Sequence, residues 1–323
     1  MAKAHAPRSG SMQFWPRKRA KRSHARIRAV RKSKEAKPLL FAGYKVGMTH
    51  LMYVDNSKTS LTKGQEISTP VTIIECPPLK IYAVKSYKNV DGNLTAKKQF
   101  NFTADKEFAR AASMPKKHET PQIKLNEEEF DELRLLVYTQ PKLTGIGKKK
   151  PEIFEIPLGG SKADQLKYVQ SLPKEIRLSD VFKEGAIIDI HSITKGKGFQ
   201  GPVKRFGVRL RQKKSEKTKR GPASLGAWKS QGHIMYRVAH AGQMGYHTRT
   251  EYNKWMIKLS NDASNINRKG GHLKYGNVKN TYCLITGSVG GSKKRLVKMT
   301  PPIRNKSEML EIPKITYISG VSQ

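Results

Sequence analysis

Residues 195–250 read KGKGFQGPVKRFGVRLRQKKSEKTKRGPASLGAWKSQGHIMYRVAHAGQMGYHTRT, and this stretch decides how the rest of the chain must be organised. Thirteen Lys or Arg and a single acid, Glu216, lie between Lys195 and Arg237. Charges of one sign at this density repel one another and keep a free segment extended and mobile, and a buried cation needs a partner charge. We therefore expect an arm that is folded by an external polyanion, with the rest of the protein holding its two ends.

Glycines recur along this arm and let its backbone turn sharply and approach another backbone closely. Aromatic side chains that suit stacking on bases are interleaved among the cations, at Phe199, Phe206, Trp228, Tyr236 and Tyr246. An RNA backbone supplies the missing counter-charge and releases counterions when it is bound. The arm is thus predicted to bind RNA.

The formal net charge of +38 is spread unevenly. Residues 1–38 and 195–237 carry +12 each and residues 238–323 carry +10, whereas residues 39–194 carry only +4. This asymmetry points to nucleic acid or an anionic membrane as the partner. No window approaches the roughly 18–20 apolar residues that a membrane span needs, so the sequence favours a nucleic acid and predicts no membrane association.

The two cysteines, Cys76 and Cys283, form no CxxC pair, which excludes a zinc site built on thiolates. Two buried, reduced thiols are expected, with a lone disulfide as the alternative. The N-terminal segment has no apolar core of a secretory signal. PRKRAKR, residues 16–22, fits a nuclear localisation signal or an RNA-binding tail equally well. Without a partner, residues 1–37 should be disordered, although Phe14 and Trp15 argue that this tail docks.

β-branched runs bounded by prolines and turn residues predict a mainly β fold. Residues 39–55 are expected to form two short strands around a bend, with further strands at 70–78, 80–90 and 93–102. Strand character returns over 178–194, residues 282–291 and 294–302 are expected to pair as a hairpin, and 315–320 suits a closing strand. This spacing favours a barrel or a sandwich.

The pattern over 93–179 predicts an α+β insertion. Thr103 is expected to cap one helix and Asn126 to open a short acidic helix over 127–133, followed by a strand over 133–140. Ser161 and Asp164 resemble a capping box at the start of another helix. Consecutive acids on the acidic helix point in different directions, so a solvated face is preferred to a catalytic or metal site.

Two catalytic or cofactor interpretations fail on their context. GKGFQG, residues 196–201, has the G-x-G-x-x-G spacing of a dinucleotide site, but Pro202 and a run of cations follow where a helix and a later acid are needed. The histidines at 191, 233, 240, 247 and 272 lack metal-ligand spacing and nearby acids. They are interpreted as donors to phosphates or base edges.

Several motifs resemble the large-subunit ribosomal protein L three family. The run from Phe182 to Arg205 resembles that family's signature, and FAGYKVGMT, residues 41–49, resembles its opening strand. PRKRA near the N-terminus, LGAW at 225–228 and AGQMGYHTRT at 241–250 are similar to the archaeal and eukaryotic branch. Lys219 stands where eukaryotic members have a histidine, and the chain has no long basic C-terminal tail, which favours the archaeal type.

The resemblance implies a translation-protein-type β-barrel that is discontinuous in sequence. Its expected parts are a basic extension over 1–37, a barrel from 38–92 and 180–320, an α+β insertion over 93–179, and the RNA-threading arm over 195–250. The implied role is that of a non-enzymatic structural constituent of the large ribosomal subunit. It would bind ribosomal RNA near the 3′ end early in assembly, with Trp228 at a loop tip that reaches toward the peptidyl transferase centre.

The implied partners are large-subunit ribosomal RNA and neighbouring ribosomal proteins, in cytoplasmic ribosomes, with no homo-oligomer and no cofactor beyond magnesium bound to the RNA. The residues expected to contact RNA combine the cations and aromatics of the tail and arm with a few polar side chains. They are Phe14, Trp15, Arg17, Lys18, Arg19, Lys21, Arg22, Lys195, Lys197, Phe199, Lys204, Arg205, Arg209, Arg211, Lys213, Lys214, Lys217, Lys219, Arg220, Trp228, Lys229, His233, Arg237, His240, Gln243, Tyr246, His247 and Arg249.

Two other function classes are weighed against this one. An RNA-modifying enzyme with basic appendages would need a cofactor pocket in the 39–194 globule, where no motif for one is found. A general nucleic-acid compaction protein would lack a structured core, whereas the composition of 39–194 is that of a globular domain.

Overall fold

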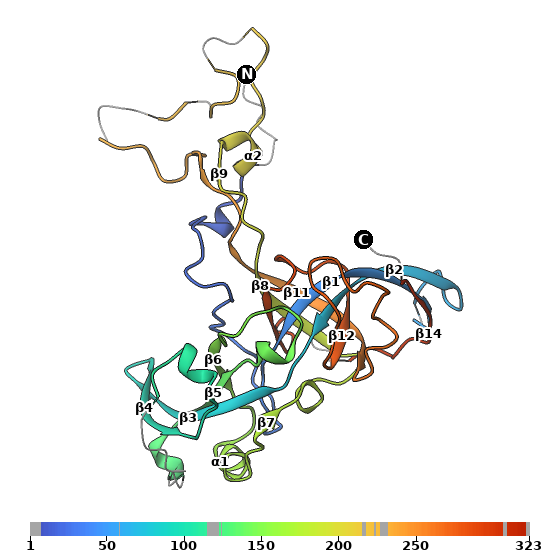
Figure 1. Ribbon diagram of the computed structural model, residues 1–323. Coiled ribbons are helices and arrows are strands. Elements are labelled where there is room, and N and C mark those ends of the chain that lie inside the picture. The colour runs from blue at the N-terminus through green and yellow to red at the C-terminus, as the bar shows by residue number, and fades with distance from the viewer. Residues whose placement is uncertain are drawn as a thin grey trace. The chain divides into compact units, whose positions relative to one another are not determined.

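The structure is a computed structural model that describes residues 8–57, 59–114, 123, 125–214, 218–222, 224–226, 232–305 and 309–320 (Figure 1). The chain divides into two compact units. Unit 1 comprises Met1–Ser23 and Ile193–Arg249, and unit 2 comprises His24–Ser192 and Thr250–Gln323.

Within the described residues, seven antiparallel strands form the larger sheet, in the order β13-β8-β11-β12-β2-β1-β14. They are β1 (Phe41–Val54), β2 (Glu66–Glu75), β8 (Ile187–Ile193), β11 (Thr248–Ser260), β12 (Tyr282–Thr286), β13 (Leu296–Thr300) and β14 (Ile315–Ile318). β13 also pairs with β1, from Phe41 opposite Met299 to Tyr44 opposite Leu296. The ladder therefore returns to its first strand, as closure of the predicted barrel requires, and the barrel stays a prediction. Its assignment to a translation-protein type remains a prediction.

β1 is one continuous strand of 14 residues, so the expectation of two short strands was wrong. The pairing register with β2 shifts between Lys45 and Gly47, and such a bulge bends a strand without ending it. Gly43 lies so close to β2 that an added Cβ would approach a side-chain carbon of Ile74 to 2.6 Å and the sulfur of Cys76 to 2.7 Å. The glycines that suggested a turn thus serve a bulge and a close approach.

β12 and β13 do not pair with each other, so the predicted hairpin was also wrong. β12 pairs with β11 and β2, whereas β13 pairs with β8 and β1. The two strands are buried along most of their length, because each is central in the ladder and contributes to the core. β12 and β13 follow one another in the sequence across a glycine-rich loop, and this suggested a hairpin. Their true partners lie far away in the chain, and the local sequence does not identify them.

A second, smaller sheet of the described residues contains five strands. They are β3 (Leu79–Val90), β4 (Asn93–Asn101), β5 (Glu132–Tyr138), β6 (Ile153–Pro157) and β7 (Glu175–Ile176). The predicted turn at Asp91-Gly92 joins β3 to β4 and has positive φ angles of 51° and 77°, the requirement of a two-residue hairpin loop. The segment 38–92 therefore contributes strands to both sheets.

Helices are few in the part of the chain that the structure describes. The capping box predicted at Ser161 and Asp164 is confirmed at the start of α1 (Lys162–Gln170). The acidic helix is reduced to one 3-10 turn because β5 begins at Glu132 and buries alternate residues. The 3-10 turns are η1 (Met12–Phe14), η2 (Phe108–Arg110), η3 (Glu127–Glu129), η4 (Pro141–Leu143) and η5 (Leu178–Asp180). No helix among the described residues has the length and apolar character that crossing a membrane requires.

The main hydrophobic core of unit 2 is built from the inward faces of these strands. Cys76 and Cys283 are buried in it as free thiols, with their sulfurs 4.0 Å apart, which confirms the expectation of two buried, reduced cysteines. Burial, and next the neighbouring Cys283, raises the pKa of Cys76 well above its ordinary value. Since the thiolate is the reactive form of cysteine, both observations point to a packing role.

His191 is a buried titratable group of β8. Its Nδ1 is 3.0 Å from the hydroxyl of Thr250 and its Nε2 is 3.0 Å from that of Thr300. Burial lowers the pKa of His191 to about 4, against an attraction from Asp189 and together with a repulsion from Lys298. The imidazole is therefore neutral in the folded protein at neutral pH, and the histidine is a core residue rather than an RNA contact.

This burial predicts an acid-sensitive core. The unfolded chain takes up a proton at His191 near pH 6.5 and the folded chain only near pH 4, so stability should fall as the pH drops through this window, by about 3 kcal/mol in all. His191→Gln keeps a polar side chain between the two threonines and does not titrate. Thermal unfolding at pH 7 and pH 4.5 should show a smaller loss for this variant than for the wild type. Equal losses would contradict the assignment.

Candidate RNA-binding site

Unit 1 holds a short stem at the base of the arm. β9 (Phe199–Gln200) pairs with β10 (Gly242–Gln243), and α2 (Pro202–Phe206) follows β9 directly. No helix was predicted after GKGFQG, and this prediction was wrong. Pro202 occupies the first turn, where its missing N–H costs nothing, and Gly207 ends the helix at φ 69°. With five residues and no following acid, α2 still lacks what a dinucleotide site needs.

The stem is closed by backbone hydrogen bonds between its two strands. The N–H of Lys197 donates to the carbonyl of Met244, and the N–H of Met244 donates to that of Gly198, both at 2.9 Å. Gly245 has φ 74°, and an added Cβ would stand 2.1 Å from the carbonyl oxygen of Lys195. Only glycine fits there, which explains the GQMG sequence on the returning strand.

Arg205 joins three backbone segments of unit 1. Its guanidinium donates to the carbonyls of Gln243 and His240 at 2.9 Å, and to that of Arg17 at 3.2 Å. Arg17 in turn donates to the carbonyl of Arg205 at 2.6 Å. The tail and both strands of the stem are therefore tied together by one cation whose hydrogen bonds go to carbonyl dipoles.

Phe206 is the centre of a cluster of aromatic rings and guanidinium groups. It is 5 % exposed, with its ring centroid 5.4 Å from that of Trp15. The guanidinium carbons of Arg17 and Arg205 lie 4.2 Å and 4.9 Å from the ring, and Tyr236 meets Trp15 edge-on at 6.0 Å. Flat cations stack on rings while keeping their edges for hydrogen bonds, so this cluster orders the tail without neutralising its charge.

Two more stacked pairs continue along the tail. The guanidinium carbon of Arg19 lies 5.4 Å from the ring of Tyr246, and that of Arg249 lies 5.0 Å from the ring of Phe14. The N–H of Ala20 donates to the carbonyl of Tyr246 at 2.9 Å. In the described residues, stacking and backbone hydrogen bonds tie the tail to the base of the arm. The mobility of tail and arm in the free protein and the docking of Phe14 and Trp15 stay predictions.

His247 is buried in this unit and engaged at both ring nitrogens. Nε2 accepts the N–H of Gly245 at 3.0 Å, so Nδ1 carries the proton and donates to the carbonyl of Lys18 at 2.8 Å. Burial lowers the pKa of His247, which keeps this neutral tautomer at neutral pH. Gln243 likewise donates to the carbonyls of Met244 and Gly245. These two predicted RNA contacts therefore hold the stem in shape.

The other predicted RNA contacts fall into two groups, half-buried and exposed, apart from three that the structure does not describe. The half-buried ones belong to the network just described: Trp15, Arg17, Arg205, His240, Gln243, Tyr246 and Arg249. Lys217, Trp228 and Lys229 lie outside the described residues. The exposed ones are Phe14, Lys18, Arg19, Lys21, Arg22, Lys195, Lys197, Phe199, Lys204, Arg209, Arg211, Lys213, Lys214, Lys219, Arg220, His233 and Arg237.

A small cavity of about 210 Å³ opens beside the aromatic cluster. Among the described residues, the Nε1 of Trp15 and the Nε of Arg17 are buried polar atoms without a hydrogen-bond partner. Buried donors of this kind cost free energy unless an acceptor reaches them. Cations, an aromatic wall and unsatisfied donors suit a phosphate or a base edge. The cavity is lined by Trp15, Pro16, Arg17, Lys18, Arg205 and Phe206.

Phe206 and Tyr236 were not among the predicted contact residues, although both had been noted as interleaved aromatics. Phe206 is the last residue of α2, directly before the glycine that ends the helix. An apolar residue in that position, in an otherwise basic stretch, was the available signal for a packed residue. Tyr236 remains 76 % exposed, as does Phe199, so both rings present a face on which a base can stack.

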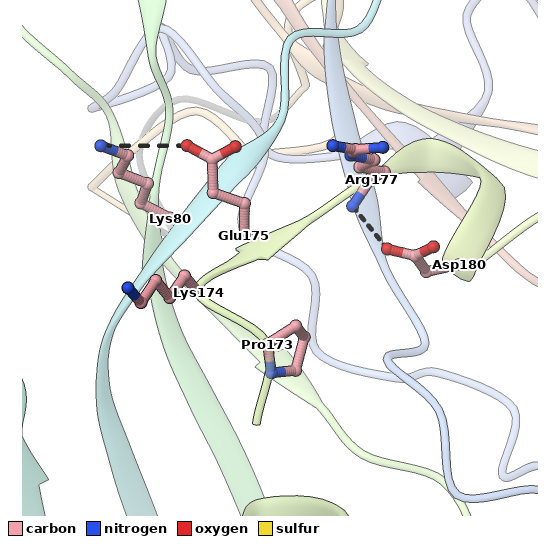
Figure 2. A pocket seen from close by; sticks show the side chains of 6 residues that line it. All are labelled: Lys80, Pro173, Lys174, Glu175, Arg177 and Asp180. Atoms are coloured by element: carbon pink, nitrogen blue, oxygen red, sulfur yellow. Dashed lines mark hydrogen bonds and ion pairs between the residues drawn. The ribbon is translucent and has the colours of Figure 1, made fainter. Parts of the chain in front are cut away.

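An open depression of about 600 Å³ lies in unit 2, where a modifying enzyme would need its pocket. Its two carboxylates are engaged: Glu175 pairs with Lys80 at 3.8 Å and Asp180 accepts the N–H of Arg177 at 2.8 Å (Figure 2). No cluster of three His, Cys, Asp or Glu suited to a metal occurs among the described residues. The depression therefore gives no specific support to an enzymatic function.

The whole chain, residues 1–323, matches the family model described as Ribosomal protein L3. It is 43% identical over 335 residues to the large ribosomal subunit protein uL3 of Methanothermobacter thermautotrophicus, covering 100% of this chain and 99% of the relative. It is 44% identical over 328 residues to that of Archaeoglobus fulgidus, covering 99% of each chain. These relatives are archaeal, as the sequence motifs predicted, and the chain belongs to the ribosomal protein L3 family.

Proposed function

We propose that this chain is a non-enzymatic, RNA-binding constituent of the large ribosomal subunit. Its family membership and the names of its relatives support the placement in that subunit. The observation that carries RNA binding is unit 1, whose two sequence stretches contain a single acid, Glu216, beside the exposed cations. Packing uses the stacking faces of Arg17 and Arg205 and leaves the lysines of the surface available to phosphates.

In unit 1, one set of residues holds the stem in shape and another set contacts the RNA. Arg205, Phe206 and His247 fix the stem, and the fixed stem presents Lys195, Lys197 and other cations at constant spacing. A surface ordered before binding loses less conformational entropy on association than a flexible one. Phosphate contacts then set the position of the RNA, and exposed rings such as Phe199 stack on unpaired bases.

The finer features implied by the family remain proposals. We infer that the protein binds large-subunit ribosomal RNA near its 3′ end early in assembly, beside other ribosomal proteins, in cytoplasmic ribosomes. The arm would reach toward the peptidyl transferase centre with Trp228 at its tip. Magnesium would be present only through the bound RNA, and no homo-oligomer is proposed.

An arm deletion tests the proposal. Removing residues 209–233 takes away arm cations and keeps Phe206 and Tyr236, so unit 2 should unfold in one cooperative transition with an unchanged midpoint. Incorporation into reconstituted large subunits should fall strongly, because these cations contribute electrostatic affinity. Calorimetry and sedimentation of reconstituted particles measure the two effects. Normal incorporation of the deleted protein would contradict an RNA-binding role of the arm.

A further inference from the structure

Three loops of unit 2 carry a second group of cations, which contains none of the predicted contact residues. They are residues 141–150, 266–280 and 287–295, and none of the three contains an Asp or Glu. The first loop lies within residues 39–194, whose net charge is only +4, and the other two lie within residues 238–323, which carry +10. The Lys and Arg of these loops are Lys142, Lys148, Lys149, Lys150, Arg268, Lys269, Lys274, Lys279, Lys293, Lys294 and Arg295.

Direct contacts hold the three loops side by side. The side-chain amide of Asn280 donates to the carbonyl of Leu143 at 3.2 Å, and a Cβ on Gly145 would lie 3.3 Å from the carbonyl oxygen of Asn277. The ammonium of Lys293 donates to the carbonyl of Leu273 at 3.1 Å. Cations that are far apart in the sequence therefore lie on neighbouring loops. Lys142 is paired with Glu107 and Lys148 with Glu152, so we base the inference on the other cations of the three loops.

The central loop is held rigidly by a buried carboxylate. Glu75 is fully buried and accepts hydrogen bonds from the hydroxyl of Tyr275, from the backbone of Lys279 and from both the backbone and side chain of Asn280. Ile266, Tyr275 and Val278 pack into the core. Glu75 thus accepts hydrogen bonds inside the protein and holds the loop in place. Its carboxylate is not available to the loop's exposed lysines, which we expect to be neutralised by a negatively charged partner.

Some buried side-chain nitrogens of loop 266–280 lack hydrogen-bond partners among the described residues. In the described part of the chain, Nε and Nη2 of Arg268 and Nε2 of His272 are buried without one. Burial, followed by the charges of Arg268 and Lys293, lowers the pKa of His272, so these cations lie close enough to repel a further positive charge. Desolvated nitrogens without partners are costly in the free protein, and a group that brings oxygens and hydroxyls relieves that cost.

We propose that these three loops form a second RNA-binding surface of this protein, which contacts the phosphodiester backbone independently of unit 1. The inference rests on the proposed function and assigns to it a site on unit 2. RNA fits better than an acidic protein, because the surface is polar apart from exposed Leu273 and Leu143 and offers little apolar area for a protein interface core. A Cβ added at Gly147 or Gly270 would meet no atom within 4 Å, so the space above these two glycines is open to a nucleic-acid backbone.

A charge-matched pair of variants tests the surface. The test variant replaces one exposed lysine in each loop, Lys149→Gln, Lys269→Gln and Lys294→Gln. The control variant replaces three exposed lysines elsewhere in unit 2 and has the same net charge, with Lys97→Gln, Lys167→Gln and Lys174→Gln. The probe is purified large-subunit ribosomal RNA, bound by the full chain over a range of KCl concentrations at constant Mg²⁺.

Each lost phosphate contact should reduce the slope of log affinity against log salt by about 0.7–0.9, so the test variant should lose a slope of roughly 2–3. Its affinity at about 0.1 M salt should fall on the order of 100-fold, whereas the control should stay within about twofold of the wild type. Equal behaviour of the two variants would overturn the inference. Absence of salt-dependent binding by the wild type would overturn both the inference and the proposed function.

Two further outcomes separate the alternatives. Arg268→Met keeps the packing stem and removes the buried guanidinium, so it should weaken RNA binding while the Tm of the free protein stays equal or rises. A lowered Tm with unchanged RNA affinity would make Arg268 a structural residue and contradict the inference. The triple variant Lys149→Gln, Lys269→Gln, Lys294→Gln gives a second outcome. If it binds RNA normally but the reconstituted subunits lack a neighbouring ribosomal protein, the three loops form a protein interface and the inference is wrong.

Discussion

Replacing five exposed cations of unit 1 with glutamine is expected to weaken binding to large-subunit ribosomal RNA by about three orders of magnitude at about 0.1 M salt. The variant combines Lys195→Gln, Lys197→Gln, Lys204→Gln, Arg209→Gln and Lys213→Gln. All five side chains are exposed, so the free protein should keep its Tm. The slope of log affinity against log salt should fall by roughly 3.5–4.5, because each phosphate contact contributes about 0.7–0.9.

The control for this variant carries the same charge change on unit 2. Lys63, Lys97, Lys167, Lys174 and Lys183 are all exposed and lie outside the cationic loops. Their replacement by glutamine should leave affinity within severalfold of the wild type. If the two quintuple variants lost affinity equally, net charge alone would explain binding and unit 1 would have no particular role.

Phe206→Ala and Phe199→Ala should have opposite effects on stability and binding. Phe206 is 5 % exposed beneath Trp15 and two guanidinium groups, so its truncation should destabilise the packing of unit 1 by about 3–5 kcal/mol. Phe199 is 76 % exposed, so its truncation should leave stability unchanged and cost about 1–3 kcal/mol of RNA binding through lost stacking. Amide hydrogen exchange of residues 193–207 and 237–249 reports the first effect.

The binding constant for ribosomal RNA reports the second effect. Protection of unit 1 that survives Phe206→Ala would contradict the role of the aromatic cluster. An RNA affinity that is unchanged by Phe199→Ala would show that this ring does not stack on a base. Both variants replace a phenylalanine with alanine. Any difference between their effects on stability and on RNA affinity therefore comes from the surroundings of the side chain and not from its chemistry.

Local signals in the sequence predicted local structure well. The side chains at Ser161 and Asp164 satisfy the first backbone groups of α1, and this pattern depends on four consecutive residues. The Asp91-Gly92 turn is similarly local, because both residues must adopt positive φ. Such features are readable from the sequence since their causes lie within one turn of chain.

Pairing between distant strands was not readable in the same way. β12 and β13 looked like a hairpin, yet Cys283 pairs with Ile74 and Lys298 pairs with His191. Each of these pairings joins segments more than 100 residues apart, and the hydrophobic pattern of a strand does not name its partner. β1 looked like two strands because a bulge between Lys45 and Gly47 leaves the same glycine signal as a turn.

The site was predicted in composition but not in its internal organisation. Counting charges located the tail and the arm, and it gave no hint that Arg205 bonds three carbonyls or that His247 is buried. Those roles depend on non-local contacts: Arg205 reaches His240 and Gln243 on the returning strand, and the tail meets Arg205 and His247 from 188 and 229 positions away in the sequence. The cationic loops of unit 2 were missed for a related reason. A charge count over 39–194 averages Lys149 and Lys150 with nearby acids, and the +10 counted over 238–323 does not reveal that loop 266–280 contacts both loop 141–150 and loop 287–295.

Photochemical cross-linking of protein to RNA in native large subunits, followed by mass spectrometry of the cross-linked peptides, tests the central claim most directly. The account predicts that RNA cross-links concentrate in residues 8–23 and 193–249, with Phe199 and Tyr236 among the reactive rings because both are 76 % exposed. A weaker set is predicted in residues 266–280. Cross-links confined to the strands and α1 of the smaller sheet region, with none in the tail or the arm, would contradict it.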